Sequence, residues 1–223
     1  MGLGMIETYP DGAALADAAA SAIAAQLTEA LRTHGRAGLV ATGGRSPGPI
    51  YDRLAATAEV DWPRVVVTLS DERCVAADDP DSNARLVRAR LLRGTAAKAH
   101  LLPLWPVPDP TALAALLPFD VVMLGMGEDG HIASLIPGDP GLEAGLTTAD
   151  LLRDVPAGLG KPPVARVTLT LSAVMNARAV FLFVAGGAKR EVIRRAEAGE
   201  DLPVTRLIAQ SKAPIRIFWH PDP

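Results

Sequence analysis

Short apolar segments alternate with segments of helical periodicity along nearly the whole chain, and this alternation limits the fold more than any other feature. The segment 64–69 (RVVVTL) is continuous and β-branched, which is typical of a parallel strand buried on both faces. Further strands are predicted at 38–41, 101–104, 119–124, 166–171, 179–185 and 215–219, and helices at 11–31, 47–54, 82–92 and 189–198. This alternation predicts an α/β fold with a mainly parallel sheet and helices on both faces.

The remaining segments do not divide the chain. The stretch 137–163 is rich in glycine and proline and is interpreted as an irregular excursion, not as a linker between domains. No internal repeat or low-complexity segment interrupts the alternation. We therefore expect a single domain over residues 1–223.

Composition excludes several classes of protein. The 223 residues carry 22 Lys and Arg against 25 Asp and Glu, so a net charge of −3 offers no basic surface for nucleic acid or an anionic membrane. A single cysteine, Cys74, excludes an internal disulfide framework and a cysteine-cluster metal site. No apolar run approaches the roughly 18 residues of a membrane helix. No basic and apolar leader begins the chain, and a cytoplasmic location is expected.

Three glycine-bearing turns each follow a predicted strand and are each expected to open a helix. They are Gly43-Gly44-Arg45-Ser46, the segment 125–131 (GMGEDGH) and Gly186-Gly187-Ala188-Lys189. In an open parallel sheet, ligands bind beyond the carboxyl ends of the strands. Glycine lets the backbone approach a ligand closely, and a helix N-terminus presents free N–H groups to an anion. Three such turns favour a binding site for an anionic ligand at this edge.

A fourth, charged turn, Ser70-Asp71-Glu72-Arg73, directly follows RVVVTL. Arg73 and Lys189 are cations at strand ends, and together they are suited to hold a phosphate. Alternatively, Arg73 pairs with Asp71 or with another surface carboxylate. Arg45 either adds a phosphate contact or faces solvent, and the N–H groups around it are the stronger candidates.

His131 is the candidate proton carrier. An imidazole that titrates near pH 6.5 can take and return a proton at neutral pH. Asp129, two residues earlier, either orients the ring or caps a helix. The other three histidines are expected at structural or surface positions, and Cys74 is expected to be a packed residue.

The segment 125–130 fits the G-x-G-x-x-G pattern of dinucleotide sites, but its context does not. Pro137 limits any following helix to about two turns, and no strand with a ribose-binding acid follows at the usual distance. A dinucleotide site is therefore not expected.

Several motifs resemble those of the glucosamine-6-phosphate isomerase/6-phosphogluconolactonase family, and of its lactonases in particular. The resemblance covers about residues 9–219 and rests on ATGGRSP, LSDERCV with DSN, FDVVMLGMGEDGHIASLIPG and FLFVAGGAKREVI. It implies a Rossmann-like αβα sandwich, like that of glucosamine-6-phosphate deaminase and ribose-5-phosphate isomerase. The implied reaction is hydrolysis of 6-phospho-D-glucono-1,5-lactone without metal or cofactor.

The resemblance also implies roles for single residues. His131 would activate water as a general base, with Asp71 and Asp129 orienting it, the water or sugar hydroxyls. The substrate would be bound by Gly43, Gly44, Arg45, Ser46, Arg73, Asn83, Gly127 and Lys189. The N–H groups near Gly44 or Gly127 are candidates to stabilise the oxyanion.

Two other functions remain to be weighed against the lactonase. The deaminases of this fold carry a glutamate five residues after the histidine, where this chain has Ile136. A non-catalytic sugar-phosphate sensor would normally append a DNA-binding helix-turn-helix, and about 35 residues before the first glycine turn offer no basic recognition helix. The expected partner is a phosphosugar lactone, and the expected state is a monomer, with a weak homodimer as the alternative.

Overall fold

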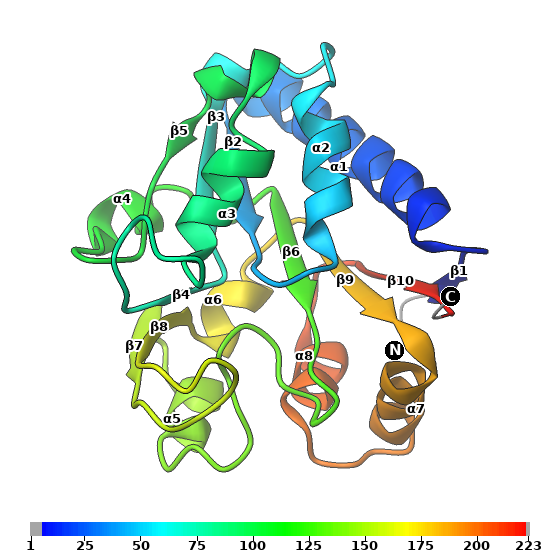
Figure 1. The fold of residues 1–223 in the computed structure, drawn as a ribbon, viewed down its shortest axis with the longest axis vertical. Coiled ribbons are helices and arrows are strands. Elements are labelled where there is room, and N and C mark those ends of the chain that lie inside the picture. Colours follow the sequence, from blue (N-terminus) through cyan, green and yellow to red (C-terminus); the bar gives the residue numbers. More distant parts are fainter. Residues whose placement is uncertain (1–5, 222–223) are drawn as a thin grey trace.

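The computed structural model describes residues 6–221, and its centre is a seven-stranded sheet (Figure 1). The strand order is β1-β10-β9-β6-β2-β3-β5, and all neighbours in it are parallel. Its strands are β1 (Ile6–Thr8), β2 (Ala37–Ala41), β3 (Val65–Leu69), β5 (His100–Leu101), β6 (Val121–Gly125), β9 (Val180–Ala185) and β10 (Ile215–His220). The α/β prediction with a parallel sheet is confirmed.

Helices cover both faces of this sheet. One layer consists of α1 (Gly12–His34), α2 (Pro47–Ala55) and α3 (Asn83–Arg90). The other contains α6 (Leu171–Met175), α7 (Gly186–Glu197) and α8 (Pro203–Gln210). The remaining helices are α4 (Pro110–Ala114), α5 (Leu142–Thr147) and two short 3₁₀ helices, η1 (Trp62–Arg64) and η2 (Gly94–Lys98).

A hydrophobic core lies between the sheet and each of the two helical layers. Alternate side chains of the strands contribute to both cores. In β2, Leu39 packs into the core under α1, whereas its neighbour Val40 packs into the core on the opposite face. Phe183 and Val184 divide in the same way in β9. Because successive strand residues point to opposite faces, a strand buried on both sides must be apolar throughout. This explains the continuous apolar runs.

Helix α1 follows its local sequence signals. The Asp11 side chain accepts a hydrogen bond from the N–H of Ala14 at 2.8 Å and caps the N-terminus. The helix ends at Gly35, whose φ of +74° belongs to the left-handed region that glycine adopts readily. Leu15, Ile23 and Leu27 form its buried stripe.

A second sheet, not predicted from the sequence, extends from the carboxyl end of β3. It is antiparallel, with the order β4-β8-β7, and consists of β4 (Asp71–Arg73), β8 (Arg166–Leu169) and β7 (Leu152–Val155). Ser70 alone joins β3 to β4. The expectation of an irregular 137–163 segment was wrong in part, because this stretch contains α5 and β7.

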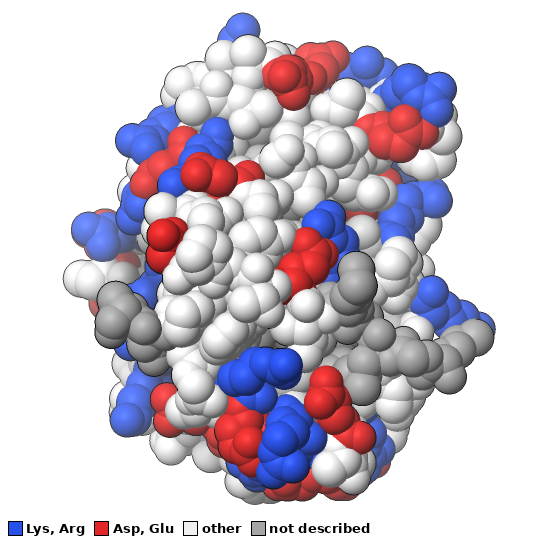
Figure 2. Space-filling model, turned by 90° about the vertical axis from the view of Figure 1, so that its right-hand side faces the viewer, with Lys and Arg blue, Asp and Glu red and all other residues white. Residues whose placement is uncertain are grey.

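Charges of both signs mix on the surface. On the face shown in Figure 2, basic and acidic side chains lie in adjacent groups with uncharged surface between them. Several arginines are paired with carboxylates, among them Arg53 with Asp17 and Arg195 with Glu200. Within residues 6–221, every helix is too short or too polar to cross a membrane.

The core makes a stability prediction. Leu182 in β9 is fully buried, and we expect Leu182→Ala to lower the free energy of unfolding by about 2–5 kcal/mol, because it removes apolar contacts and leaves a cavity. Val107→Ala, at a side chain 79% exposed, should change it by less than about 0.5 kcal/mol. Urea denaturation of both variants measures the difference, and equal effects would contradict this assignment of the core.

Candidate active site

Four neighbouring strands carry the residues singled out in the sequence at their carboxyl ends. β9, β6, β2 and β3 are consecutive in the sheet and parallel, so these ends lie along one edge. The segment 43–46 follows β2, the segment 125–131 begins at the end of β6, and Lys189 lies in the first turn of α7, after β9. Asp71 and Arg73 lie in β4, which begins one residue beyond β3.

The loop after β6 folds back on itself. The N–H of Gly127 donates to the carbonyl oxygen of His131 at 3.0 Å, and that of Gly130 donates to Gly127 at 3.1 Å. The next helix along the chain, α5, begins only at Leu142, so the expectation that this turn opens a helix was wrong. The tight return brings the imidazole of His131 next to the carboxylate of Asp129.

Gly127 is required by the closeness of this approach. A Cβ at position 127 would lie 2.2 Å from Nδ1 of His131 and 2.4 Å from Oδ1 of Asp129, which no real side chain tolerates. The glycine therefore serves the packing of the histidine and the aspartate. Its N–H donates to the carbonyl oxygen of His131, so this one N–H among those near Gly127 already has a partner.

His131 and Asp129 form a hydrogen-bonded pair. Nδ1 of His131 lies 2.6 Å from Oδ1 of Asp129, and the His131 backbone N–H donates to the same oxygen at 3.2 Å. The side-chain hydrogen bond lowers the pKa of the Asp129 carboxyl against the opposing effect of burial. An ionised Asp129 accepts a hydrogen bond from the protonated Nδ1. Nε2 is then the basic atom of the neutral ring. The His131 side chain is 31% exposed, so the ring is accessible.

Asp71 makes its hydrogen bonds elsewhere than to His131. Ser134 donates to Oδ2 at 2.6 Å and Ser70 donates to Oδ1 at 3.1 Å. Ser134 lies three residues after His131, so Asp71 anchors the far side of the histidine loop. Within the part of the chain that the structure describes, no hydrogen bond joins Asp71 to His131 itself.

Arg166 in β8 is a buried cation that the sequence analysis did not single out. Its Nη1 lies 3.7 Å from Oδ2 of Asp71 and donates to Ser134 at 3.2 Å. Burial lowers the pKa of its guanidinium, although the Asp71 charge opposes this effect. Its position as the one charged residue of an otherwise uncharged predicted strand could have indicated a buried, partnered cation.

Asn83 connects Asp71 with the turn after β2. Its Nδ2 donates to the carbonyl oxygen of Asp71 at 2.8 Å. A Cβ at Gly43 would lie 2.0 Å from Oδ1 of Asn83, so the amide occupies the space beside this glycine. Asn83 is buried and positions the turn.

Glu72 also supports this region, a role that the sequence analysis missed. Its carboxylate accepts hydrogen bonds of 2.7 Å from the N–H groups of Asn83 and Ala84, the first two residues of α3. A buried carboxylate is stabilised by the positive end of a helix. Glu72 thereby fixes Asn83 in place.

The turn after β2 is shaped by glycine and by a buried phenol. The Tyr51 hydroxyl accepts from the Thr42 N–H at 2.8 Å and donates to the Thr42 carbonyl oxygen at 2.6 Å. Gly44 has φ +94°, which favours glycine, and Arg45 is exposed. Helix α2 begins with Pro47 and Pro49, which have no N–H, so the amides of residues 44–46 are the stronger anion donors.

The two candidate phosphate cations differ in their surroundings. Arg73 donates to the carbonyl oxygen of Asp81. Lys189 is half-buried and makes no ion pair or hydrogen bond to other residues of 6–221. Helix α7 opens with Gly186 at φ +85°, and no side chain caps its first N–H groups. This arrangement suits an anion near Lys189.

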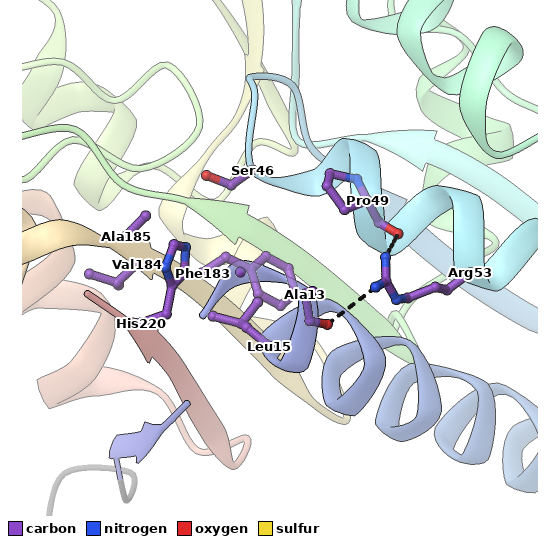
Figure 3. A pocket seen from close by; sticks show the side chains of 10 residues that line it. Ala13, Leu15, Ser46, Pro49, Arg53, Phe183, Val184, Ala185 and His220 are labelled. Carbon is purple, nitrogen blue, oxygen red and sulfur yellow. Dashed lines mark hydrogen bonds between the residues drawn. The ribbon is translucent and has the colours of Figure 1, made fainter. Parts of the chain in front are cut away.

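A cavity of about 230 Å³ lies beside the turn that follows β2, at the carboxyl ends of β9 and β10 (Figure 3). Ser46 lines it from the position before α2, Ala185 from the end of β9 and His220 from the end of β10. Leu15 and Phe183 give it an apolar wall. The candidate site thus continues past Ser46 into a partly apolar space. Residues 6–221 contain no group of three or more His, Cys, Asp or Glu side chains arranged to hold a metal ion.

These features define an α/β enzyme site, with a histidine–carboxylate pair and a glycine-bearing turn suited to an anion at one sheet edge. Residues 10–219 match the family described as Glucosamine-6-phosphate isomerases/6-phosphogluconolactonase. The chain belongs to this family.

Similar proteins and solved structures belong to the same family. A protein of Caulobacter vibrioides named 6-phosphogluconolactonase is 42% identical over 96% of each chain, and one of Pseudomonas putida with the same name is 39% identical over 97% of this chain and 93% of its own. The crystal structure of a 6-phosphogluconolactonase from Shewanella baltica superposes with a TM-score of 0.89 at 36% identity, covering 98% of this chain and 100% of that one. A monomeric glucosamine-6-phosphate deaminase, 16% identical with a TM-score of 0.75, shares the fold.

The histidine loop makes a prediction that needs no substrate. Gly127→Ala should break the hydrogen bond between Asp129 and His131, because the new methyl group takes the space of both side chains. Imidazole ¹⁵N spectra should show Nδ1 protonated in the unaltered protein and a mixture of tautomers in the variant. Gly125→Ala is the matched control, since a Cβ at residue 125 meets nothing within 4 Å. Unchanged spectra for Gly127→Ala would contradict the described packing.

Proposed function

We propose that this protein hydrolyses 6-phospho-D-glucono-1,5-lactone to 6-phospho-D-gluconate, with His131 as the general base. The observation that carries the proposal is the 2.6 Å contact between His131 and Asp129 at the edge that also holds the anion-binding turn. The relatives that match over nearly their whole length carry the name of this activity. A phosphate-bearing ester and a free basic nitrogen fit such an edge.

The proposed reaction needs one proton carrier. Nε2 of His131 takes a proton from water while the water oxygen bonds to C1 of the lactone, and the carbonyl electrons move to the carbonyl oxygen. When the tetrahedral intermediate collapses, the bond from C1 to the ring oxygen breaks, and the ring oxygen takes the proton from Nε2. The products are a carboxylic acid, which ionises, and a free hydroxyl. Asp129 holds Nδ1 and stabilises the transient imidazolium.

The remaining candidate residues are proposed to bind and position. The amides of Gly44, Arg45 and Ser46, with Lys189 and Arg73, would hold the 6-phosphate. Alternatively, the N–H of Gly44 stabilises the oxyanion instead of the phosphate, because no backbone oxygen of residues 6–221 accepts from it. Asp71 is proposed as a positioning residue that acts through Ser134, with Asn83 and Gly43 shaping the turn.

A glucosamine-6-phosphate deaminase is the second candidate. Isomerisation requires a further acid–base group beyond the histidine, and Ile136 stands at the position of the deaminase glutamate. Ile136 is buried and carries no proton. A sensor would need an effector surface, and the face in Figure 2 has mixed charge instead of a basic stripe. Both functions are therefore weaker candidates.

The setting of the activity is also proposed. We expect one domain, since the small sheet continues directly from β3 through Ser70. We further expect a cytoplasmic monomer that needs neither metal nor cofactor.

His131→Ala should reduce kcat for lactone hydrolysis about 10²–10⁴-fold, because water then lacks a base. Acid release from freshly generated lactone measures this loss against the spontaneous rate. His100→Ala, at an exposed histidine of β5, should retain full activity. An undiminished rate for His131→Ala would remove His131 from the mechanism.

Lys189→Ala should raise KM about tenfold or more with a smaller effect on kcat, since a charged hydrogen bond to phosphate is lost. Lys98→Ala is the control at an exposed lysine of η2. The unphosphorylated lactone should react poorly both with the unaltered protein and with Lys189→Ala. If it is hydrolysed as well as the phosphorylated lactone, the phosphate assignment is wrong.

A further inference from the structure

A second cavity, of about 260 Å³, lies at the opposite edge of the large sheet from the candidate active site. Gly38, near the start of β2, and Asp120, just before β6, line it, so it faces the amino ends of these strands. The lining also includes His34, Arg36, Leu116 and Arg178. None of the residues proposed for lactone hydrolysis lines this cavity.

Asp120 is a buried carboxylate, and one of its oxygens takes part in an ion pair but in no hydrogen bond. Its Oδ2 accepts from the N–H of Gly38 at 2.8 Å and ties β2 to β6. Its Oδ1 lies 3.2 Å from Nε of Arg178, but the angle does not make a hydrogen bond, and this oxygen has no hydrogen-bond partner in the described chain. The residue is only 6% exposed. A buried acceptor without a donor is costly, so a donor brought into the cavity would be stabilised.

Apart from Asp120, the charged side chains of the lining are basic, and most of the other lining residues are apolar. Arg36 is exposed and takes part in no ion pair or hydrogen bond with other residues of the 6–221 segment. Arg178 is exposed as well, and within residues 6–221 its one ion pair is with Asp120. His34, the last residue of α1, also lines the cavity. Two guanidinium groups at one cavity are suited to a carboxylate or a phosphate. The single carboxylate of Asp120 lies at the base and leaves the rim positive.

We propose that this cavity binds a small organic anion that carries a hydroxyl group, of the class of phosphorylated hydroxy acids. Its anionic groups pair with Arg36 and Arg178, and its hydroxyl donates to Oδ1 of Asp120. Both features are needed, since an anion alone leaves Asp120 without a donor and a neutral polyol leaves the arginines without a partner. The cavity volume is ample for a ligand of three or four carbons. This site is independent of the proposed hydrolysis.

The test uses 3-phospho-D-glycerate as the probe and the backbone amide signals of Gly38 and Asp120 as reporters. Titration of the unaltered protein should shift both signals in a saturable way. Arg36→Gln should weaken binding about tenfold or more, because it removes a charge-assisted contact. Since Arg36 has no internal partner, this variant should fold normally. Arg178→Gln should weaken binding to a similar extent.

Two controls separate this site from the other edge. Arg32→Gln, at an exposed arginine of α1 paired with Glu29, should bind the probe unchanged. Lys189→Ala should abolish any shifts near Gly44 and leave those at Gly38 intact. The proposal is overturned if Gly38 and Asp120 do not shift, or if Arg36→Gln binds as tightly as the unaltered protein.

Discussion

The candidate site depends on the interactions of one buried carboxylate, that of Asp71. It receives hydrogen bonds from Ser134 of the histidine loop and from Ser70 at the end of β3, and it faces the Arg166 guanidinium of the small sheet. Removing one partner of a buried ion pair leaves an uncompensated charge and costs about 3–5 kcal/mol. The network therefore fixes the loop that carries His131 to the frame of both sheets.

The histidine is positioned from two sides. Asp129 sets the ring from within its own loop, and Ser134 anchors the chain three residues later. Gly127 allows the loop to close, because any side chain there would displace both members of the pair. A side chain held in this way loses little entropy when a ligand binds, which is the advantage of preorganised groups.

The same parallel strands relate the two edges of the sheet. β2 and β6 begin beside the cavity at Gly38 and Asp120 and end at the glycine-bearing turn and the histidine loop. The carboxylate of Asp120 holds the two strands together at their origin. The chemistry of the two edges differs, since one presents a histidine–aspartate pair and backbone amides and the other presents arginines around a buried acid.

The sequence by itself determined the parallel sheet, because a strand buried on both faces must be apolar throughout and RVVVTL could fold in few other ways. It also determined which turns meet at the carboxyl edge. Only the tertiary structure decided that Asp71 bonds Ser134 instead of His131, and that Arg166 joins them, since these partners lie 63 and 95 positions from Asp71. Of the antiparallel sheet, the sequence predicted only the strand near β8. β4 and β7 were hidden, because these short strands are stabilised by pairing with β8 and not by a pattern of their own.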